Sequence, residues 1–279
     1  MNLFPEFKKQ YGSWGVVAGA SEGLGSAYAH ALAERGLNVL TIARRTPALE
    51  RDAQLIRDRY GVQVQTLALD LTAADMPETF AKAIDGLDIG ILICNAGLWV
   101  ISEFMQTTAQ DHQRMLDLNC RSLISLLHPM AQRFKKQQRG GIVIMSSLSG
   151  MQGNALLSSY AATKAFDTVL AEGLWAELKP YGVDVLACVA GAMATPGFYQ
   201  VTPQAKQASA FPAYPGEVAR RTLDALQNKK QQPLFIPASG PRFANAMARF
   251  MSRTLRTRFF SHMNRKLYGD AVTTRKQNT

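Results

Sequence analysis

Residues 14–36 read "WGVVAGASEGLGSAYAHALAERG", a strand-like run joined to a helical pattern by a glycine-rich turn. The opening "WGVVAG" is apolar enough for a buried strand, and the closing "SAYAHALAERG" has helical composition. Gly19, Gly23 and Gly25 fall where such a turn needs unusual dihedral angles, a close backbone approach to a phosphate and tight helix–strand packing. Their spacing differs from the G-x-G-x-x-G fingerprint, which leaves a purely structural turn as the alternative. The strand-to-helix placement favours a dinucleotide phosphate site.

The same alternation continues along the chain. Further apolar runs occupy residues 38–43, 62–69, 89–94, 141–146, 183–190 and 233–237, and segments of helical composition include 23–35, 108–137 and 158–180. Several runs are apolar at nearly every position, as in strands covered by helices on both faces. The pattern predicts an α/β, doubly wound (Rossmann) fold with a mostly parallel seven-stranded sheet. We assign residues 1–239 to this single dinucleotide-binding and catalytic domain and residues 240–279 to a basic helical extension.

Composition excludes a disordered chain and indicates the compartment. The 279 residues are 47% hydrophobic and 19% charged, and no apolar run approaches the ~18 to 20 residues of a membrane span. The start "MNLFPEFKKQ" lacks the apolar core of a signal peptide. Cys94, Cys120 and Cys188 have no metal-like spacing and lie in or beside apolar runs. We therefore expect buried thiols in a reducing, cytoplasmic setting and no metal site.

The net charge of +10 is concentrated at the C-terminus. Residues 240–279 hold nine Lys or Arg and one acid, Asp270, so this segment carries +8 and the rest +2. A basic segment could meet membrane phosphates, nucleic acid or an acidic partner. Its Phe, Met and Leu residues also suit a helix packed over the substrate mouth or a neighbouring subunit, which we favour. Peripheral membrane contact stays open, whereas nucleic-acid binding rests on charge alone and is not expected.

The end of the second strand indicates the cofactor. It reads "ARR", and a basic group there accommodates a 2′-phosphate where an acid would bind the ribose of NAD. Arg44, the first residue after the strand, is our principal candidate, and Arg45 is its assistant; either could instead be a solvated residue opening the next helix. Asp70, which ends "LALD", is placed to meet the adenine end, although an Asp after a strand is also a common turn residue.

A tyrosine and a lysine in "YAATK", Tyr160 and Lys164, share one face of a predicted helix. Such a pair also arises by chance on solvated surfaces, so its context decides. The chain contains in order "GASEGLG", "NAG" (95–97), Asn119, Ser147 and "YAATK". With these motifs it resembles the short-chain dehydrogenase/reductase family over residues 12–237. It looks most like the branch that contains 17β-hydroxysteroid dehydrogenases and long-chain 3-oxoacyl reductases.

The resemblance implies roles for individual residues. Tyr160 would be the acid or base and Lys164 its partner. Ser147, thirteen residues before the tyrosine, would donate to the substrate carbonyl, which leaves Ser146 structural. Asn119 would be the fourth catalytic member and position a water beside the lysine, although it could also satisfy backbone in a helix bend. The implied cofactor-binding residues are Gly19, Ser21, Gly23, Leu24, Gly25, Arg44, Arg45, Asp70, Asn95, Gly97, Tyr160, Lys164 and Thr195, the last at the nicotinamide carboxamide.

Three positions depart from the family pattern. Ala18 replaces a Thr before the first glycine, Cys94 replaces the first Asn of Asn-Asn-Ala-Gly, and Ala190 replaces the Pro of a Pro-Gly. The Thr hydroxyl helps to tie the first turn to the Asn-Ala-Gly segment. Losing such a hydrogen bond costs on the order of 1 kcal/mol, so we expect a looser cleft that still binds its cofactor.

Residues 191–217 lie where the family has a mobile substrate loop. Its large apolar side chains are Met193, Phe198, Tyr199, Phe211 and Tyr214, and candidate walls are Trp99, Leu148 and Met151. Apolar sites suit apolar ligands, although any one of these side chains could instead pack in the core or in a subunit interface. We expect a hydrophobic ketone or secondary alcohol, such as a steroid or a 3-oxoacyl chain.

The function predicted is an NADP(H)-dependent oxidoreductase. A ketone that accepts hydride develops negative charge on its oxygen, and it needs a proton donor and a preorganised hydrogen bond there. A tyrosine beside a lysine meets that need, because the cation stabilises the phenolate. The alternative is a non-catalytic NADP-binding regulatory or scaffold protein, which would have no need of the four catalytic residues. We also expect a homo-oligomer, either a dimer or a tetramer.

Overall fold

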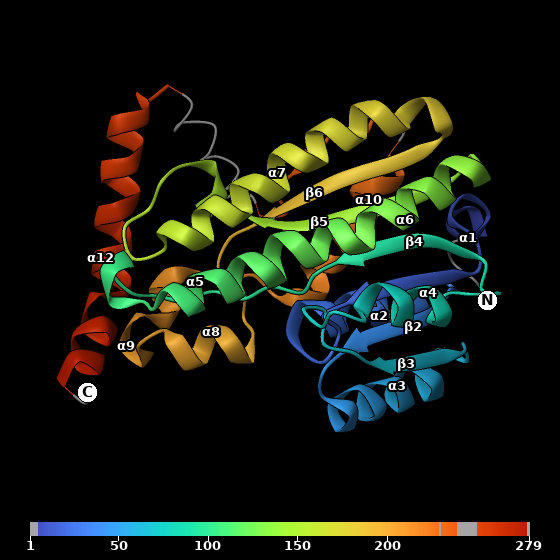
Figure 1. Ribbon diagram of the computed structural model, residues 1–279, viewed down its shortest axis with the longest axis horizontal. Helices are drawn as coiled ribbons and strands as arrows, with labels where there is room; N and C mark the ends of the chain where they lie inside the picture. Colours follow the sequence, from blue (N-terminus) through green and yellow to red (C-terminus); the bar gives the residue numbers. More distant parts are fainter. Residues whose placement is uncertain (1–4, 229, 239–249, 278–279) are drawn as a thin grey trace.

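The computed structural model describes residues 5–228, 230–238 and 250–277. Seven strands form one parallel sheet in the order β3-β2-β1-β4-β5-β6-β7 (Figure 1). The strands are β1 Trp14–Ala18, β2 Asn38–Ala43, β3 Val64–Ala68, β4 Ile89–Cys94, β5 Gly140–Ser147, β6 Val183–Ala190 and β7 Leu234–Phe235. This confirms the predicted doubly wound fold, although β3 and β7 are each three residues shorter than their apolar runs of 62–69 and 233–237.

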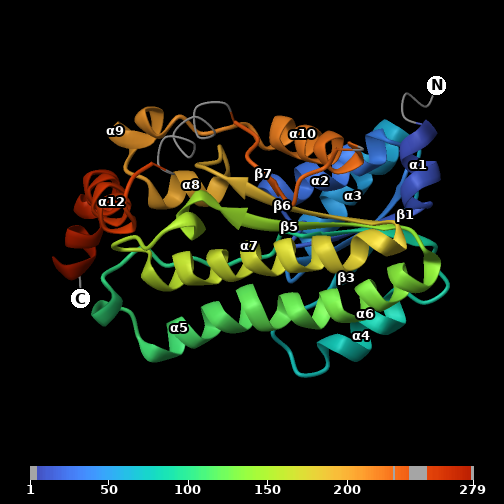
Figure 2. The same ribbon diagram turned by 90° about the horizontal axis from the view of Figure 1, so that it is seen from above.

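Helices cover both faces of the sheet. The α-helices are α1 Pro5–Tyr11, α2 Gly23–Glu34, α3 Thr46–Tyr60, α4 Met76–Ala83, α5 Ala109–Leu116, α6 Ser122–Gln137, α7 Ser158–Leu178, α8 Pro196–Val201, α9 Gln204–Gln207, α10 Pro215–Gln227 and α12 Arg253–Gln277. Shorter helical turns are η1 Phe104–Gln106, η2 Asp117–Arg121, η3 Leu148–Met151, η4 Lys179–Tyr181 and η5 Ala208–Ala210. Figure 2 shows α2, α3 and α10 on one face and α4, α6 and α7 on the other. Each face has its own buried apolar cluster, as a sheet between two helical layers requires.

The strand register brings the predicted site together. Ala18 pairs with Cys94 across β1 and β4, and Ser147 pairs with Ala190 across β5 and β6. The carboxyl ends of these four strands therefore meet at one edge. Between β1 and β4 the strand order changes direction, and ligands of doubly wound sheets bind outside the carboxyl ends at this switch point.

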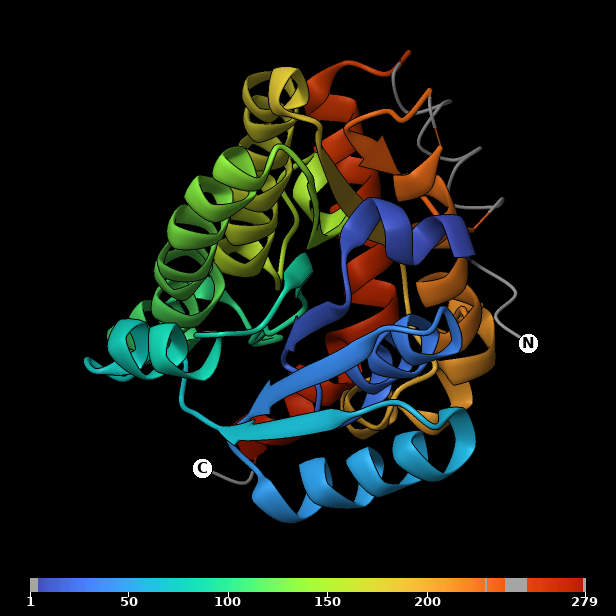
Figure 3. The ribbon, with the colours of Figure 1, turned by 90° about the vertical axis from the view of Figure 1, so that its right-hand side faces the viewer.

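The C-terminal helix α12 packs across that same end of the molecule. Figure 3, viewed from the opposite end, shows α12 beyond the sheet and the helical layers on either side. The hydroxyl of Ser261 accepts from the Ala155 N–H at 3.0 Å, and Lys206 in α9 donates to the Lys266 carbonyl at 2.7 Å. The predicted boundary at residues 239 and 240 lies outside the described residues and stays a prediction. Among the described helices, none is both long and apolar enough to cross a membrane.

Candidate active site

The turn after β1 is closed by contacts that only glycine permits. Gly19 has a φ of +86°, and a Cβ there would lie 2.6 Å from the backbone of Ala96. A Cβ on Gly25 would overlap the carbonyl oxygen of Gly19 and approach the Asn95 amide nitrogen to 2.7 Å. The start of α2 thus packs directly on the turn that precedes it, as the glycine spacing predicted.

Asn95 fastens this turn to the end of β4. Its side-chain nitrogen donates to the Gly19 carbonyl at 2.8 Å. The backbone N–H groups of Asn95 and Ala96 both donate to the Ala18 carbonyl, at 3.0 and 2.9 Å. These three bonds join the turn to the Asn-Ala-Gly segment without a hydroxyl at position 18. They offset the loss of the hydroxyl that led us to expect a looser cleft from Ala18.

The beginning of α2 is open to an anion. Within the described chain, no side chain caps the first turn, because the N-cap Glu22 makes no such bond. Its leading N–H groups are therefore available, as in phosphate-binding helix N-termini. Ser21 lies at this end, where its hydroxyl accepts from Arg45 at 3.0 Å. Leu24 differs, since its side chain is buried in the core and leaves only backbone facing the turn.

The two arginines after β2 take different positions. Arg45 forms an ion pair with Glu22 at 3.0 Å, so it lies over the glycine turn. Arg44 is exposed and near Asp70. The pKa of Asp70 is lowered first by hydrogen bonds from Thr72, at 2.9 Å from its N–H and 2.7 Å from its hydroxyl, and less by the charge of Arg44. Asp70 therefore forms the turn that the sequence left as an alternative role.

Tyr160 and Lys164 project from the first turns of α7 toward the cleft. The Lys164 nitrogen lies 5.9 Å from the centre of the Tyr160 ring. It donates to the Met145 carbonyl at 2.7 Å and to Asp167 at 2.9 Å. A Cβ on Gly97 would lie 3.6 Å from this nitrogen, so the Asn-Ala-Gly segment borders it. The helix therefore holds a buried cation beside a half-buried phenol.

Asn119 lies in η2, a π-helical segment between α5 and α6. Its side-chain oxygen accepts from the Leu98 N–H at 2.7 Å, and its nitrogen donates to the Leu98 carbonyl at 2.8 Å and to the Thr163 hydroxyl at 3.0 Å. The amide therefore clamps the loop after β4 against α7. This is the backbone-satisfying role that the sequence analysis kept as an alternative.

The two serines that end β5 have different surroundings. The Ser146 hydroxyl donates to the Lys164 carbonyl at 2.8 Å and lies 2.7 Å from the Thr168 hydroxyl, both buried. Ser147 is half-buried, and its hydroxyl accepts from the Ser149 N–H at 3.1 Å. Its own proton is thus available to a further acceptor, as a donor to a substrate carbonyl requires.

Thr195 lies opposite the glycine turn. Its hydroxyl caps α8 by accepting from the Phe198 N–H at 3.3 Å. A Cβ on Gly23 would lie 3.1 Å from the methyl group of Thr195. The turn after β1 and the loop after β6 therefore meet at the carboxyl edge of the sheet.

A family model described as short chain dehydrogenase matches residues 14–206. The chain belongs to this family. Its predicted membership is confirmed, and the chain is an oxidoreductase of the dehydrogenase/reductase type.

Individual relatives agree with the branch expected from the sequence. A 7beta-hydroxysteroid dehydrogenase of Clostridium sardiniense is 33% identical over 80% of this chain and 85% of its own length. A very-long-chain 3-oxoacyl-CoA reductase of Phaeosphaeria nodorum is 28% identical over 93% of this chain and 77% of its own. Among solved structures, one from a study of 7beta-hydroxysteroid dehydrogenase stereoselectivity matches with a TM-score of 0.85 at 26% identity, over 93% of this chain and 99% of that one. A short-chain dehydrogenase of Sphingobium yanoikuyae in complex with NADPH matches with a TM-score of 0.71 at 30% identity, over 85% of this chain and 93% of that one.

In this short-chain dehydrogenase, the apolar residues predicted to form a lid and its walls divide into three groups. Phe198 is 7% exposed, and the Trp99 indole lies against Gly197 in the same helix, 2.9 Å from where a Cβ would be. Tyr199, Phe211 and Tyr214 are exposed. Met193, Leu148 and Met151 are partly buried against the two core clusters. The last three therefore have the core contacts that were the alternative to a role as lid or wall.

The sequence analysis missed Tyr268 on α12. Its pKa is raised, first by burial and also by the charge of Tyr160, while the Thr202 hydroxyl beside it acts in the opposite direction. The C-terminal helix of this short-chain dehydrogenase thus brings a phenol to the neighbourhood of Tyr160. The sequence analysis favoured a helix over the substrate mouth or a neighbouring subunit, but it named no side chain of the tail for that role.

Proposed function

We propose that the protein is an NADP(H)-dependent oxidoreductase that interconverts a hydrophobic ketone and its secondary alcohol. The observation that carries the proposal is the Lys164 ammonium, buried beside the Tyr160 ring at the switch point of the sheet. A cation there stabilises a phenolate. The bound nicotinamide would supply or accept the hydride, and the protein's side chains would transfer the proton and stabilise the charge on the substrate oxygen.

The proton chemistry would fall to Tyr160. Its hydroxyl donates a proton to the developing alkoxide during reduction and takes one from the alcohol during oxidation. Ser147 donates a second hydrogen bond to the same oxygen, where preorganised donors contribute most. Lys164 stabilises the phenolate. Asn119 keeps the loop after β4 against α7 and so fixes the width of the cleft.

The residues around the glycine turn fit a dinucleotide. A side chain on Gly25 would fill the cradle, and the uncapped start of α2 presents N–H groups to a phosphate. Arg44 and Arg45 after β2 favour the 2′-phosphate of NADP over the free ribose of NAD. Arg44 is the better candidate because Arg45 already has Ser21 and Glu22 as partners.

Replacing Arg44 with alanine is expected to weaken NADPH binding about 10- to 100-fold and to leave NADH binding unchanged. The lost contact is a charge-assisted hydrogen bond worth roughly 1.5 to 3 kcal/mol, and every 1.4 kcal/mol is tenfold. Fluorescence titration with both nucleotides measures it. Arg51→Ala, an exposed arginine of α3, is the control and should bind both like the wild type. Equal loss for the two nucleotides would place the 2′-phosphate elsewhere.

The substrate proposed is a steroid-like or 3-oxoacyl compound. Two relatives are named for a hydroxysteroid and for a very-long-chain 3-oxoacyl-CoA. In this chain the segment after β6 contributes Phe198 and the loop after β4 contributes Trp99, which lies against Gly197, and we propose that these two side chains form apolar walls of the substrate site. Apolar walls with a few convergent polar groups suit such ligands.

Tyr268 would form part of the same wall. Tyr268→Ala is expected to raise KM for the best apolar ketone about tenfold, since removing an aromatic contact costs of the order of 1.5 kcal/mol, while the affinity for NADPH stays the same. Steady-state kinetics and nucleotide titration on one preparation separate the two quantities. Tyr199→Ala, an exposed tyrosine of α8, is the comparison. An unchanged KM in Tyr268→Ala would exclude α12 from the substrate site.

The experiment that tests the function as a whole is NADPH and NADH oxidation by the full chain against a panel of apolar ketones. Turnover with NADPH on at least one steroid or 3-oxoacyl substrate is the expected result. Nucleotide binding without turnover of any ketone, or of any alcohol in the reverse direction, would favour the non-catalytic regulatory alternative.

Two surfaces bear on partners. We propose a homo-oligomer through the outer faces of α6 and α7, where Ile124, Phe166 and Val169 are exposed. A light-scattering mass of one chain would exclude it.

On α12, Leu255, Phe259 and Met263 are exposed at helical spacing among basic residues, which supports peripheral membrane contact as a further proposal. Equal sedimentation of the full chain with and without anionic liposomes would exclude it.

A further inference from the structure

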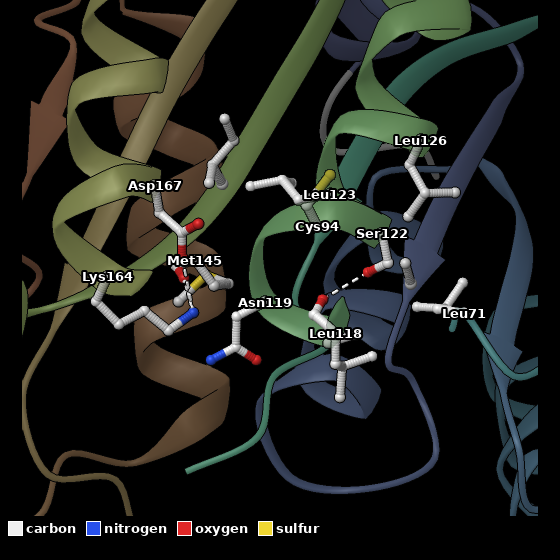
Figure 4. A pocket seen from close by; sticks show the side chains of 13 residues that line it. Leu71, Cys94, Leu118, Asn119, Ser122, Leu123, Leu126, Met145, Lys164 and Asp167 are labelled. Atoms are coloured by element: carbon white, nitrogen blue, oxygen red, sulfur yellow. Dashed lines mark hydrogen bonds and ion pairs between the residues drawn. The ribbon is translucent and has the colours of Figure 1, made fainter. Parts of the chain in front are cut away.

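An ion pair is buried directly behind the proposed catalytic group. The Asp167 carboxylate lies 2.9 Å from the Lys164 nitrogen, and the two side chains are 2% and 6% exposed. Both belong to α7 and are three residues apart, so they share one face of the helix. In Figure 4 the lysine nitrogen is directed toward Asn119, and the Asp167 carboxylate lies beside it, next to Met145.

The surroundings of Asp167 do not favour a charge. It lines a small, partly open pocket whose other walls are mostly apolar side chains, among them those of β4, β5 and α6 (Figure 4). One carboxylate oxygen meets Lys164, and the other, Oδ1, has no hydrogen-bond partner in the described part of the chain. A buried oxygen without a donor destabilises the fold, and buried ion pairs are often no more stable than apolar replacements. Stability therefore does not account for a carboxylate at this position.

Few other titratable groups face the pair. Tyr160 lies on the same helix, Cys94 at the end of β4 and Cys120 in η2. Burial is the main cause that raises the pKa of both thiols, that of Cys120 to about 11, so both stay neutral at physiological pH. Burial alone would lower the pKa of Lys164, but Asp167 and, less strongly, Tyr160 oppose it, and the net shift is upward. Asp167 is thus the principal anion that offsets the burial of the lysine.

The hydrogen bonds of Lys164 show how this pairing directs the ammonium. An ammonium has three N–H donors. One binds the Met145 carbonyl of β5 and one binds the Asp167 carboxylate of α7. The third remains for the cleft, where Tyr160 and the proposed nucleotide meet.

We propose that Asp167 is a positioning residue for the reaction: it keeps Lys164 charged and fixes the direction of its one remaining N–H. The inference rests on the proposed function, since it assigns Asp167 to the support of that site. Without the carboxylate, Lys164 would be a buried cation with only a carbonyl partner. It would lose its proton more readily and stabilise a phenolate less.

A melting-temperature cycle on the cofactor-free full chain tests the pairing without activity. The variants are Asp167→Asn, Lys164→Met and the double replacement. Each single change leaves one buried charge unpaired and is expected to lower Tm, whereas the double change removes both charges and should melt above Asp167→Asn. Losses that simply add in the double variant would overturn the inference.

The pH dependence of alcohol oxidation tests the catalytic consequence. In Asp167→Asn the acid limb of kcat should move up by at least about one pH unit, because a neutral Lys164 no longer favours the phenolate, and kcat at neutral pH should fall tenfold or more. Asp184→Asn is the matched control: this carboxylate accepts from Tyr11 at 2.8 Å near the start of β6, at the opposite edge of the sheet, and the limb should not move.

Two outcomes of this profile overturn the inference. An unmoved limb would make Asp167 structural, and a limb moved to lower pH would mean that Lys164 stays charged without it. If the wild type turns over no ketone or alcohol, the proposed function fails by itself, and the inference then stands or falls on the melting cycle.

Discussion

Tyr160→Phe is expected to lower kcat about 10³- to 10⁴-fold while NADPH affinity stays within about twofold of the wild type. General acid–base catalysis by a positioned side chain contributes up to about 10⁴-fold to the rate, and removing the proton donor should abolish most of that contribution. The ring that remains keeps its place beside Lys164, 5.9 Å from the lysine nitrogen, so packing changes little. Initial rates with the best ketone and fluorescence titration with NADPH measure the two quantities.

A matched replacement separates chemistry from the loss of a hydroxyl. Tyr181 lies in η4, immediately before β6 and thus at the opposite edge of the sheet, and Lys135 lies over its ring at 4.4 Å. Tyr181→Phe therefore repeats the same change beside a lysine far from the cleft, and it should turn over like the wild type. A Tyr160→Phe enzyme within tenfold of the wild type would mean that another group transfers the proton.

The fold was predictable because its signals are local. Buried parallel strands are apolar at nearly every position, and the runs at 89–94 and 183–190 coincide with β4 and β6. The Tyr160–Lys164 pair was equally visible, because helical spacing alone sets two side chains on one face. The last strand was overestimated: only Leu234–Phe235 pairs with β6, within an apolar run of five residues.

The parts of the site that depend on distant contacts were not predictable. Sequence favoured Arg44 but could not show that Arg45 would be held by Ser21 and Glu22, because that pairing depends on how the turn folds. It could not choose between a water-binding and a backbone-clamping role for Asn119, which depends on the path of the loop at Leu98.

Asp167 could have been noticed from sequence. It is a charge three residues after Lys164 in the otherwise apolar stretch "AFDTVL", and that spacing puts both on one helix face. What the sequence does not contain is the burial of that face against β4 and β5, and burial is what turns an ordinary surface pair into an unusual one. By contrast, the composition of the tail favoured a helix over the substrate mouth or a neighbouring subunit but did not single out Tyr268, whose position depends on contacts of α12 with distant residues such as Ala155 and Lys206.

Gly25→Ala is expected to abolish measurable NADPH binding, with at least a 100-fold loss of affinity, and to lower Tm by several degrees. The added methyl would overlap the Gly19 carbonyl oxygen and press on the Asn95 amide, so the turn must move away from the start of α2. Overpacking of this kind costs roughly 1 to 3 kcal/mol in stability. The loss of affinity is expected to be large even though the loss of stability is modest, because the same displacement turns away the N–H groups that would bind the phosphates.

Gly173→Ala is the matched control, because it makes the same change inside a helix. A Cβ on Gly173, in α7, would have nothing within 4 Å, and alanine is the better helix former by roughly 1 kcal/mol. This variant should bind NADPH like the wild type and melt slightly higher. Thermal melts and nucleotide titration on both proteins decide the matter. If Gly25→Ala lost stability but bound NADPH normally, the tight turn would be structural only, which is the alternative that its spacing left open. If it lost binding while Gly173→Ala did not, the cradle between Gly19, Gly25 and Asn95 would be the nucleotide site, because no general effect of alanine in a helix could explain the difference.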